Sequence, residues 1–266
     1  MSKYDTDKIK TFDNEVVVDE LTSALITSLD ANTLITVDYS LQAEPGMVYK
    51  VRKYMGTGNV QDLAMGEGNT ESIGASFVET AYEVKTTQGM SEYYDEQLMN
   101  DPSAIDQAVQ QLKDQMTNDI TTKVVAELEK GSHKVYNFDY SFEAIVDAMA
   151  MLPEEHNEGL YLLVARKDGS KIQKKLKDTL QYVEAFARSG YIGSVAGVPV
   201  ILTDAVETGH AYLATRDAVW CFVKKGLELE NKRDANVRKN TLFARNVKVI
   251  ALKNDNKVIV LSAAAE

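Results

Sequence analysis

The chain has 266 residues, of which 44% are hydrophobic and 26% are charged, and its formal net charge is -11. This is the composition of an ordinary globular protein, and the length suffices for one large domain or two lobes. The acidic charge argues against a protein that reads DNA sequence, but not against one that encloses DNA and repels it. Cys221 is the only cysteine, so no internal disulfide is expected. The polar start predicts no signal peptide, and no apolar run approaches the length of a membrane span, which indicates a cytosol-like setting.

Residues 1–46 form an acidic arm with three lysines and nine carboxylates. Apolar residues recur there at every fourth position, which predicts one narrow helical stripe. These residues are Val17, Leu21, Leu25 and Leu29. A short strand at 34–37 is expected to follow, and we do not expect the arm to fold independently.

Residues 47–84 are predicted to form a β-hairpin with a large tip. Its outgoing arm, 47–54, and its return arm, 77–84, carry opposite charges, which favours their pairing although each exposed pair contributes little. The charged residues are Lys50, Arg52 and Lys53 on the first arm and Glu79 and Glu83 on the second. The tip holds four glycines in thirteen residues, namely Gly56, Gly58, Gly66 and Gly68.

This hairpin has no visible core of its own. An isolated two-stranded hairpin is marginally stable in water, and a loop as long as its tip is unusual inside a compact domain. We therefore expect the segment 44–90 to be covered by a neighbouring copy of the chain. Glycine would let the tip fit different neighbour angles.

A long helix is predicted over 102–130. Asp101 can cap it, Pro102 suits its first position, and Gly131 suits the position just past its end. Apolar residues follow one face at spacings of three and four. They are Ile105, Val109, Leu112, Met116, Ile120, Val124 and Leu128. At about 1.5 Å per residue the helix would span roughly 43 Å, well beyond the mean of about 11–12 residues.

An α/β region follows. The expected elements are an amphipathic helix at 142–152 ended by Pro153, a buried strand at 160–165, a lysine-rich helix at 170–188, and strands at 198–202 and 218–223. A glycine-rich loop leads into the strand at 198–202. The residues singled out in this loop and strand are Gly190, Gly193, Gly197 and Pro199.

The segment 224–257 is basic, with ten positive and four negative side chains. Two strands, 247–252 and 258–262, are predicted to flank a turn at 253–256. An acidic arm and a basic end in one chain can steer contact between subunits, whereas the alternative is two solvated faces without a partner. Contact of the basic end with packaged DNA is the lesser interpretation.

The sequence predicts no catalytic, cofactor or metal site. His133, His156 and His210 are far apart and lack the spacing of metal ligands. Cys221 lies in an apolar run, which favours a buried inert thiol, and the pair Glu154-Glu155 favours a solvated turn. The glycine loops lack the pattern of a dinucleotide or phosphate site.

The order of these parts resembles the major capsid proteins of tailed bacteriophages, the Hong-Kong-97-type fold family. Three segments carry the resemblance. Residues 46–54 and 60–68 are similar to the family's extended loop, and the helix 102–130 is similar to its spine helix. Residues 190–200, followed by 233–235 and the closing hairpin, resemble the axial-domain loop and the return through the peripheral domain. The resemblance covers nearly the whole chain.

The resemblance implies an α+β fold. Its expected parts are an N-terminal arm at 1–43, an extended loop at 44–90, a peripheral domain at 91–136 with the spine helix, an axial domain at 137–222, and return strands of the peripheral domain at 223–266. Copies would form hexamers and pentamers and close into an icosahedral shell around double-stranded DNA, in a virion assembled in the cytoplasm of a bacterial host. Contacts between subunits are expected from the charged and glycine residues of the hairpin and from Arg233, Arg238, Lys239 and Arg245.

The resemblance also implies partners. The short arm before the extended loop implies either a separate scaffolding protein or a different assembly scheme, and a portal protein is expected, with a decoration protein left open. No lysine lies between Gly56 and Gly68, so we expect no lysine cross-link between subunits. The alternative functions are an encapsulin-like bacterial nanocompartment shell and, from another class, a small α/β enzyme.

Overall fold

The computed structural model describes residues 34–57, 61–63, 65–66, 68, 70, 74–101, 104–152, 159–179 and 193–264. Several sequence expectations lie outside these ranges. They are the helical stripe at 17–29, Gly58, Pro102, the turn with Pro153, Glu154, Glu155 and His156, the second part of the helix at 170–188, and Gly190.

The long helix α4 spans Ala104–Leu128, which confirms the helix predicted over 102–130. The predicted stripe is buried or half-buried, and its most enclosed members are at most 2% exposed. These are Leu112, Met116, Val124 and Leu128. Gly131 follows the helix because a Cβ at this position would lie 2.8 Å from Val258 Cγ1. The glycine therefore serves a close approach of two elements rather than a left-handed helix cap.

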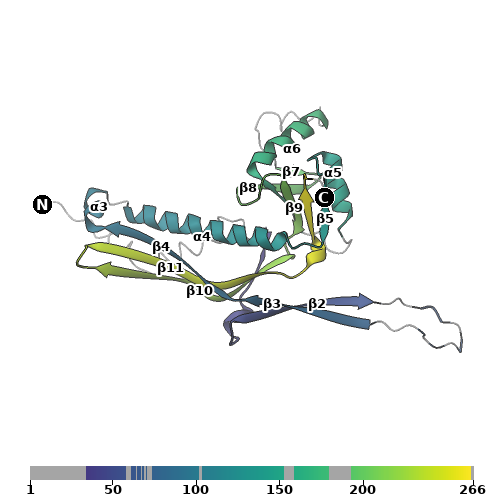
Figure 1. The fold of residues 1–266 in the computed structure, drawn as a ribbon, viewed down its shortest axis with the longest axis horizontal. Helices are drawn as coiled ribbons and strands as arrows, with labels where there is room; N and C mark the ends of the chain where they lie inside the picture. The colour runs from purple at the N-terminus through teal and green to yellow at the C-terminus, as the bar shows by residue number, and fades with distance from the viewer. Residues whose placement is uncertain are drawn as a thin grey trace.

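A four-stranded sheet, called the long sheet below, runs along α4 (Figure 1). Its strands in spatial order are β1 (Thr36–Asp38), β10 (Val219–Asp234), β11 (Lys239–Leu252) and β4 (Lys85–Tyr94). β1 pairs parallel with β10, and the other neighbours pair antiparallel. The strand expected at 34–37 corresponds to β1, and Leu34 and Ile35 before it are buried in the core.

The hairpin β10–β11 is much longer than the strands predicted at 218–223 and 247–252. Its register shifts between Val223 and Lys225 and again before Glu228. These irregularities interrupt the alternation of apolar and polar residues by which a strand is recognised. The expected boundary between the axial and peripheral domains at 222–223 falls inside β10.

Strand β4 was not predicted. Its sequence is mostly polar, and the side that faces α4 starts with Thr87 and Gly89 and has a large buried side chain, Tyr93, only near the end of the strand. A Cβ on Gly89 would lie 3.0 Å from Leu112 Cδ2, so the helix packs directly on the backbone of the strand. The expected end of the extended loop at residue 90 falls inside this strand.

The second sheet has six strands. In spatial order they are β5 (His133–Val135), β12 (Val258–Ser262), β9 (His210–Thr215), β6 (Leu160–Ala165), β8 (Val198–Thr203) and β7 (Ser194–Val195). Every residue of β6 is buried, which confirms the strand predicted from the apolar run. Helices α5 (Phe142–Ala150) and α6 (Arg166–Thr179) belong to the same lobe (Figure 1).

Strand β12 corrects one expectation. The strands at 247–252 and 258–262 were predicted to pair with each other as a closing hairpin in the peripheral domain. In the structure β11 pairs with β10 and β4, whereas β12 pairs with β5 and β9. A turn with the 3-10 helix η3 (Asp255–Lys257) therefore sends the chain from one sheet to the other. An apolar run does not specify which strand it will pair with.

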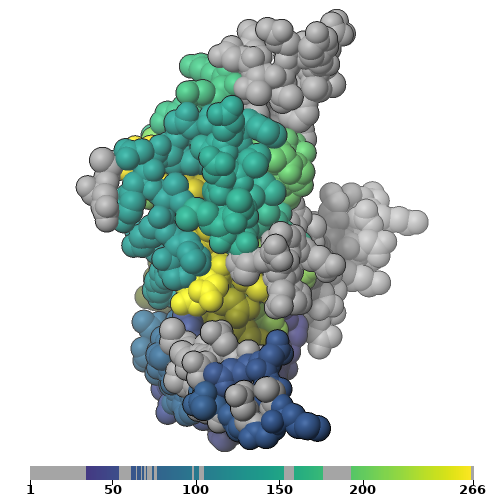
Figure 2. Space-filling view, turned by 90° about the vertical axis from the view of Figure 1, so that its right-hand side faces the viewer, coloured from purple at the N-terminus to yellow at the C-terminus, as the bar shows by residue number. Residues whose placement is uncertain are grey.

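Shorter elements complete the fold. The 3-10 helix η2 (Ser40–Gln42) precedes the hairpin, and α3 (Asp95–Asn100) follows β4 at the far end of the long sheet (Figure 1). Strands β2 (Val48–Thr57) and β3 (Gly74–Glu83) form a separate two-stranded sheet. This hairpin projects from the body in Figure 1, and it lies at the bottom in the end-on view of Figure 2.

Candidate functional site

The hairpin β2–β3 carries an ion-pair cluster on its outer face. Arg52 is the register partner of Glu79, and Arg52 Nε lies 2.8 Å from Glu79 Oε1. Lys50 Nζ lies 3.4 Å from the other carboxylate oxygen. The bonds from Arg52 and Lys50 lower the pKa of Glu79. Glu83, which was expected to join this cluster, lies instead 3.8 Å from Lys85.

The inner face of the hairpin packs on the long sheet at its base. The rings of Tyr49 and Phe222 have centroids 4.1 Å apart, and Val51 is buried. Further along, Lys53 Nζ lies 3.1 Å from Asp255 Oδ2. The expectation that the hairpin has no core of its own is therefore wrong for its base, which is covered by its own chain.

A lysine fixes the start of the hairpin. Lys224 Nζ donates to the carbonyl oxygen of Glu44 at 3.2 Å and also to that of Gly46. Gly46 has a φ of 112°, a conformation that favours glycine. On the other strand Tyr82 is half-buried, and its burial raises its pKa to about 12, with the nearby carboxylate of Glu127 as the second cause.

The distal part of the hairpin is exposed. Leu63 is 48% exposed, and Met65 in the tip is fully exposed. Gly66 has a φ of 95°, and a Cβ on Gly66 or Gly68 would meet nothing within 4 Å. Gly56 is the register partner of Ala75 near the end of β2. This part presents apolar side chains on a segment with open space around its tip.

The basic residues of the β10–β11 hairpin make ion pairs within the chain. Arg233 Nη2 lies 2.8 Å from Asp95, and Arg238 Nη1 lies 2.9 Å from Glu96. Lys239 pairs with Glu92 of β4.

Arg245 makes a similar double pair on the same hairpin. Its guanidinium lies 2.9 Å from Glu228 and 2.6 Å from Glu230. These four predicted contact residues are therefore paired with carboxylates of their own sheet and of α3, and none of these pairs was predicted.

The predicted glycine loop ends in a tight turn of the six-stranded sheet. Val195 and Val198 pair across a two-residue turn in which Ala196 has a φ of 51° and Gly197 a φ of 82°. Positive φ at both positions is typical of the turns that match the twist of a hairpin. Gly193 accepts a hydrogen bond from Val200 N, and Pro199 is the register partner of Ser194.

Groups suited to catalysis are not gathered in the described part of the chain. His133 and His210 are half-buried in the strands β5 and β9, and Cys221 is buried. Burial raises the pKa of this thiol, which makes it a poor nucleophile. Among the described residues no three His, Cys, Asp or Glu side chains could hold a metal ion, and no helix is long and apolar enough to cross a membrane.

The sequence contained a signal for the inner face of the hairpin. Tyr49, Val51 and Lys53 alternate with Lys50 and Arg52, and alternation predicts that the two sets face opposite sides of a strand. Charge alone had suggested one functional surface, whereas the structure separates an outer charged face from an inner face that anchors the hairpin. The role of Lys224 could not be predicted from the sequence, because its partners are backbone carbonyl oxygens, which every residue has.

No family model matches the sequence. The chain is 23% identical over 256 residues to a curated protein named "Major capsid protein" from Staphylococcus phage phiMR11. The match covers 93% of this chain and 92% of that protein.

Solved structures match over most of the chain. The capsid of a native GTA particle matches with a TM-score of 0.69 at 9% identity, and it covers 90% of this chain and 91% of its own. The capsid of Cyanophage P-SCSP1u has a TM-score of 0.67 at 13% identity, with coverages of 87% and 86%. A virus-like particle from Pyrococcus furiosus has a TM-score of 0.61 at 15% identity, with coverages of 92% and 99%. At these identities the likeness establishes a common fold.

Proposed function

We propose that this chain, which has the α+β Hong-Kong-97-type capsid fold, is the major capsid protein of a tailed bacteriophage. The observation that carries the proposal is that the matches to capsid proteins cover most of this chain and most of the other chain. One of these relatives is named as a major capsid protein. Copies assemble as hexamers and pentamers into an icosahedral shell. The chain acts as a structural protein rather than as an enzyme.

The hairpin supplies the contact between copies. The hairpin is fixed to its own body through Tyr49 and Lys224 at its base and through Lys53 further along, so the exposed tip is held away from that body. Exposed Leu63 and Met65 of the tip then lie against the adjacent copy. Many such weak contacts add up across a closed lattice. The glycines let the tip adapt to different neighbour angles. Different tip conformations in pentamer and hexamer subunits would support this role, and identical conformations would count against it.

We propose that the other predicted surfaces act in the same lattice. The β7–β8 turn, with Gly193, Gly197 and Pro199, lies near the centre of each capsomer. The far end of the long sheet meets neighbouring capsomers, and Arg233 and Arg238 contribute charge there although each already has a carboxylate partner.

The enclosed molecule is double-stranded DNA that the shell does not grip. The net charge of -11 repels phosphate, and Arg233, Lys239 and Arg245 of the β10–β11 hairpin are paired with carboxylates within the chain. Capsomers are therefore expected to bind DNA weakly at physiological salt. Tight binding of isolated capsomers to a duplex in a gel-shift assay would contradict this.

Assembly takes place in the cytoplasm of a bacterial host and ends in the virion. The partners are a portal protein and either a separate scaffolding protein or another scheme, and a decoration protein is left open. No lysine cross-link forms, because the tip lacks lysine and Lys50 and Lys53 are paired with carboxylates. Intact particles therefore dissolve to single chains on a denaturing gel, whereas a ladder above 29.5 kDa would contradict this.

Electron microscopy of the expressed protein tests the function. Closed shells are expected, and a solitary monomer on size-exclusion chromatography would instead favour the small α/β enzyme. A nanocompartment shell is the second candidate, favoured by the likeness to the Pyrococcus furiosus virus-like particle. Nucleic acid in purified native particles supports the capsid, and a protein cargo without nucleic acid supports the nanocompartment.

A further inference from the structure

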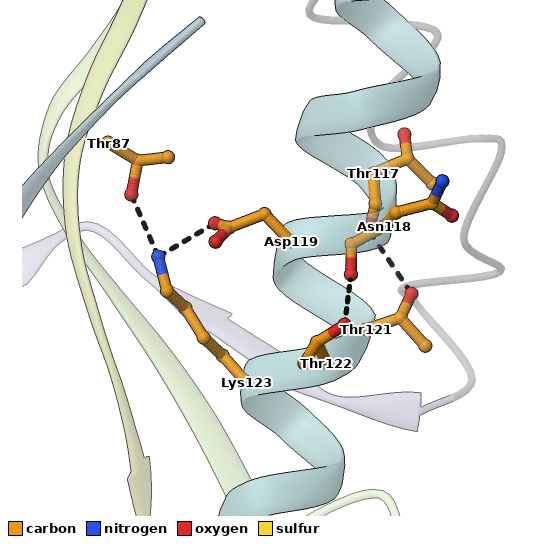
Figure 3. A network of polar contacts seen from close by, with 7 residues as sticks. All are labelled: Thr87, Thr117, Asn118, Asp119, Thr121, Thr122 and Lys123. Carbon is orange, nitrogen blue, oxygen red and sulfur yellow. Dashed lines mark hydrogen bonds and ion pairs between the residues drawn. The ribbon is translucent and has the colours of Figure 1, made fainter. Parts of the chain in front are cut away.

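A layer of polar side chains lies between α4 and the long sheet. Lys123 on the helix reaches across to β4, where its Nζ lies 2.9 Å from Thr87 Oγ1 (Figure 3). The same Nζ lies 2.7 Å from the carboxylate of Asp119, one turn earlier on the helix.

Strand β11 contributes two more members of this layer. Asn246 is the register partner of Thr87, and Lys248 lies two residues further along the strand. Side chains two residues apart on a strand share one face, so both lie on the side of the sheet that faces α4. Lys248 is only 5% exposed.

Apolar clusters enclose this polar layer on both sides along the helix. One cluster consists of Leu112, Met116, Leu242 and Ala244. The other includes Val124, Val125, Leu128 and Ile250. The polar layer therefore lies between two packed parts of the interface.

The charges in the layer are unevenly paired. Lys123 holds the carboxylate of Asp119 although the lysine side chain is 41% exposed. Within the described part of the chain, neither Lys248 Nζ nor Asn246 Oδ1 has a hydrogen-bond partner. An ion pair is stronger away from water, and an unpaired buried charge is costly. Asp119 therefore pairs with Lys123, the more exposed of the two lysines, and leaves the buried Lys248 unpaired.

The other charged and titratable groups around Lys248 do not replace this carboxylate. Cys221 of β10 is a buried thiol, and Lys85, the register partner of Lys248 on β4, is 72% exposed and lies near Glu83. Burial lowers the pKa of Lys248 to about 8, and the nearby charge of Lys123 lowers it further, whereas Cys221 and Asp119 oppose the shift.

The helix has a weak point at this layer. Thr121 Oγ1 donates to the carbonyl oxygen of Thr117 at 3.1 Å, and Thr122 Oγ1 donates to that of Asn118 at 2.8 Å (Figure 3). Hydroxyls that bond back to the carbonyl four residues earlier slightly destabilise helices and bend them. Asp119 lies in the turn that these two hydroxyl bonds span.

We propose that Asp119 exchanges partners between Lys123 and Lys248, and that this exchange is a two-position switch between α4 and the long sheet. In the second position the turn at 117–123 lies closer to β11, Asp119 pairs with Lys248, and Lys123 faces water. The use of the two positions by different copies in one shell rests on the proposed function. The exchange itself is a property of the single chain.

A mutant cycle on the unassembled chain tests the exchange. If Lys248 can take over the carboxylate, Lys123→Met changes the unfolding equilibrium in urea by less than threefold. In a Lys248→Met background, Lys123→Met then shifts the unfolding equilibrium toward the unfolded chain by tenfold or more, because Asp119 has lost both of its lysine partners. Methionine keeps the apolar stem of each lysine, so packing is retained. Equal costs in the two backgrounds would overturn the proposal.

The matched control is Lys85→Met, since Lys85 is the register partner of Lys248 but is exposed. The cost of Lys123→Met should not change in this background, and an equal increase there would also overturn the proposal. A map of assembled particles at side-chain resolution then shows whether Asp119 lies within 4 Å of Lys248 in some copies. Failure to form particles would reject the proposed function, whereas the cycle would still decide the exchange.

Discussion

Lys53 of the hairpin and Asp255 of the turn before β12 form an ion pair with their atoms 3.1 Å apart, and their side chains are only 24% and 34% exposed. This pair joins the projecting hairpin to the turn from which the chain enters the six-stranded sheet. The hairpin therefore has a contact beyond its base that fixes its direction. The position in which the hairpin tip meets another molecule depends on this contact between the hairpin and the rest of its chain.

Loss of this pair should loosen the hairpin. Lys53→Met is expected to cost up to about 1 kcal/mol in the unfolding free energy, as a partly shielded ion pair does. Cleavage of the unassembled chain by protease within 48–83 should accelerate, since the distal part loses its anchor. Limited proteolysis followed by mass spectrometry measures this.

The control is Lys50→Met, which changes a lysine of the same strand that lies on the outer face. This variant should leave the rate of cleavage unchanged, because Arg52 still holds Glu79. An equal acceleration in both variants would show that the Lys53–Asp255 pair does not fix the hairpin.

The exposed tip should matter for assembly and not for the fold. Met65→Asp changes a fully exposed side chain, so the unfolding free energy should stay within about 0.5 kcal/mol of the wild type. If the tip lies against an adjacent copy, a charge at this position lowers the yield of particles several-fold. Light scattering during assembly measures the yield.

Met151→Asp is the matched control, because Met151 is also an exposed methionine, at 50%, but follows α5 in the other lobe. Assembly by this variant should exceed that of Met65→Asp. Normal assembly of Met65→Asp would contradict the role given to the tip.

The sequence predicted the elements with regular patterns. Helix α4 was recognised because its apolar stripe continues through seven positions, and β6 because it is apolar throughout. The hairpin arms were recognised from opposing charges, although each strand proved a few residues longer. The α+β class and the capsid fold were implied by the resemblance of these parts, in their order, to the capsid family, and both are confirmed.

The missed elements lack such patterns for physical reasons. Strand β4 packs its backbone on α4 at Gly89, so only one large side chain, Tyr93, marks its buried face. Register shifts near Lys225 disguise the length of β10. Of the candidate site, the charges on the hairpin could be predicted from their signs alone. Their division between an outer face and an anchoring inner face is carried only by the alternation of Tyr49, Val51 and Lys53 with Lys50 and Arg52.

Glycine at position 131 should be needed for packing. A Cβ there would lie 2.8 Å from Val258 Cγ1 and 3.1 Å from Val258 Cβ, at the junction of α4 and β12. Gly131→Ala is therefore expected to cost about 1–3 kcal/mol of unfolding free energy, as overpacking does. Urea denaturation of the unassembled chain measures it.

Gly226→Ala is the control for this prediction. A Cβ on Gly226 would meet nothing within 4 Å, and its φ lies outside the left-handed region. The change should cost less than about 0.5 kcal/mol. Equal costs at the two positions would show that the close approach to Val258 is not what requires glycine.

The buried amine of Lys248 should make stability depend on pH. Burial lowers its pKa from 10.5 to about 8 in the folded chain. Below pH 8 the lysine is charged in both states, so the folded chain carries the full cost of the buried charge. Between about pH 8 and 10.5 the unfolded chain binds a proton that the folded chain does not, so stability rises with pH.

Replacing this lysine should therefore stabilise the chain near neutral pH. Lys248→Met removes a cost of about 3 kcal/mol at pH 7, the free-energy equivalent of the shift in pKa. Because the wild type regains stability as its lysine loses the proton, the advantage of the variant shrinks above pH 8 and vanishes near pH 10.5. Urea denaturation of both chains at pH 7, 8.5 and 10 measures the difference. An advantage that stays constant over this range would mean that Lys248 is not titrating, and a variant less stable than the wild type at pH 7 would mean that its ammonium already has a partner.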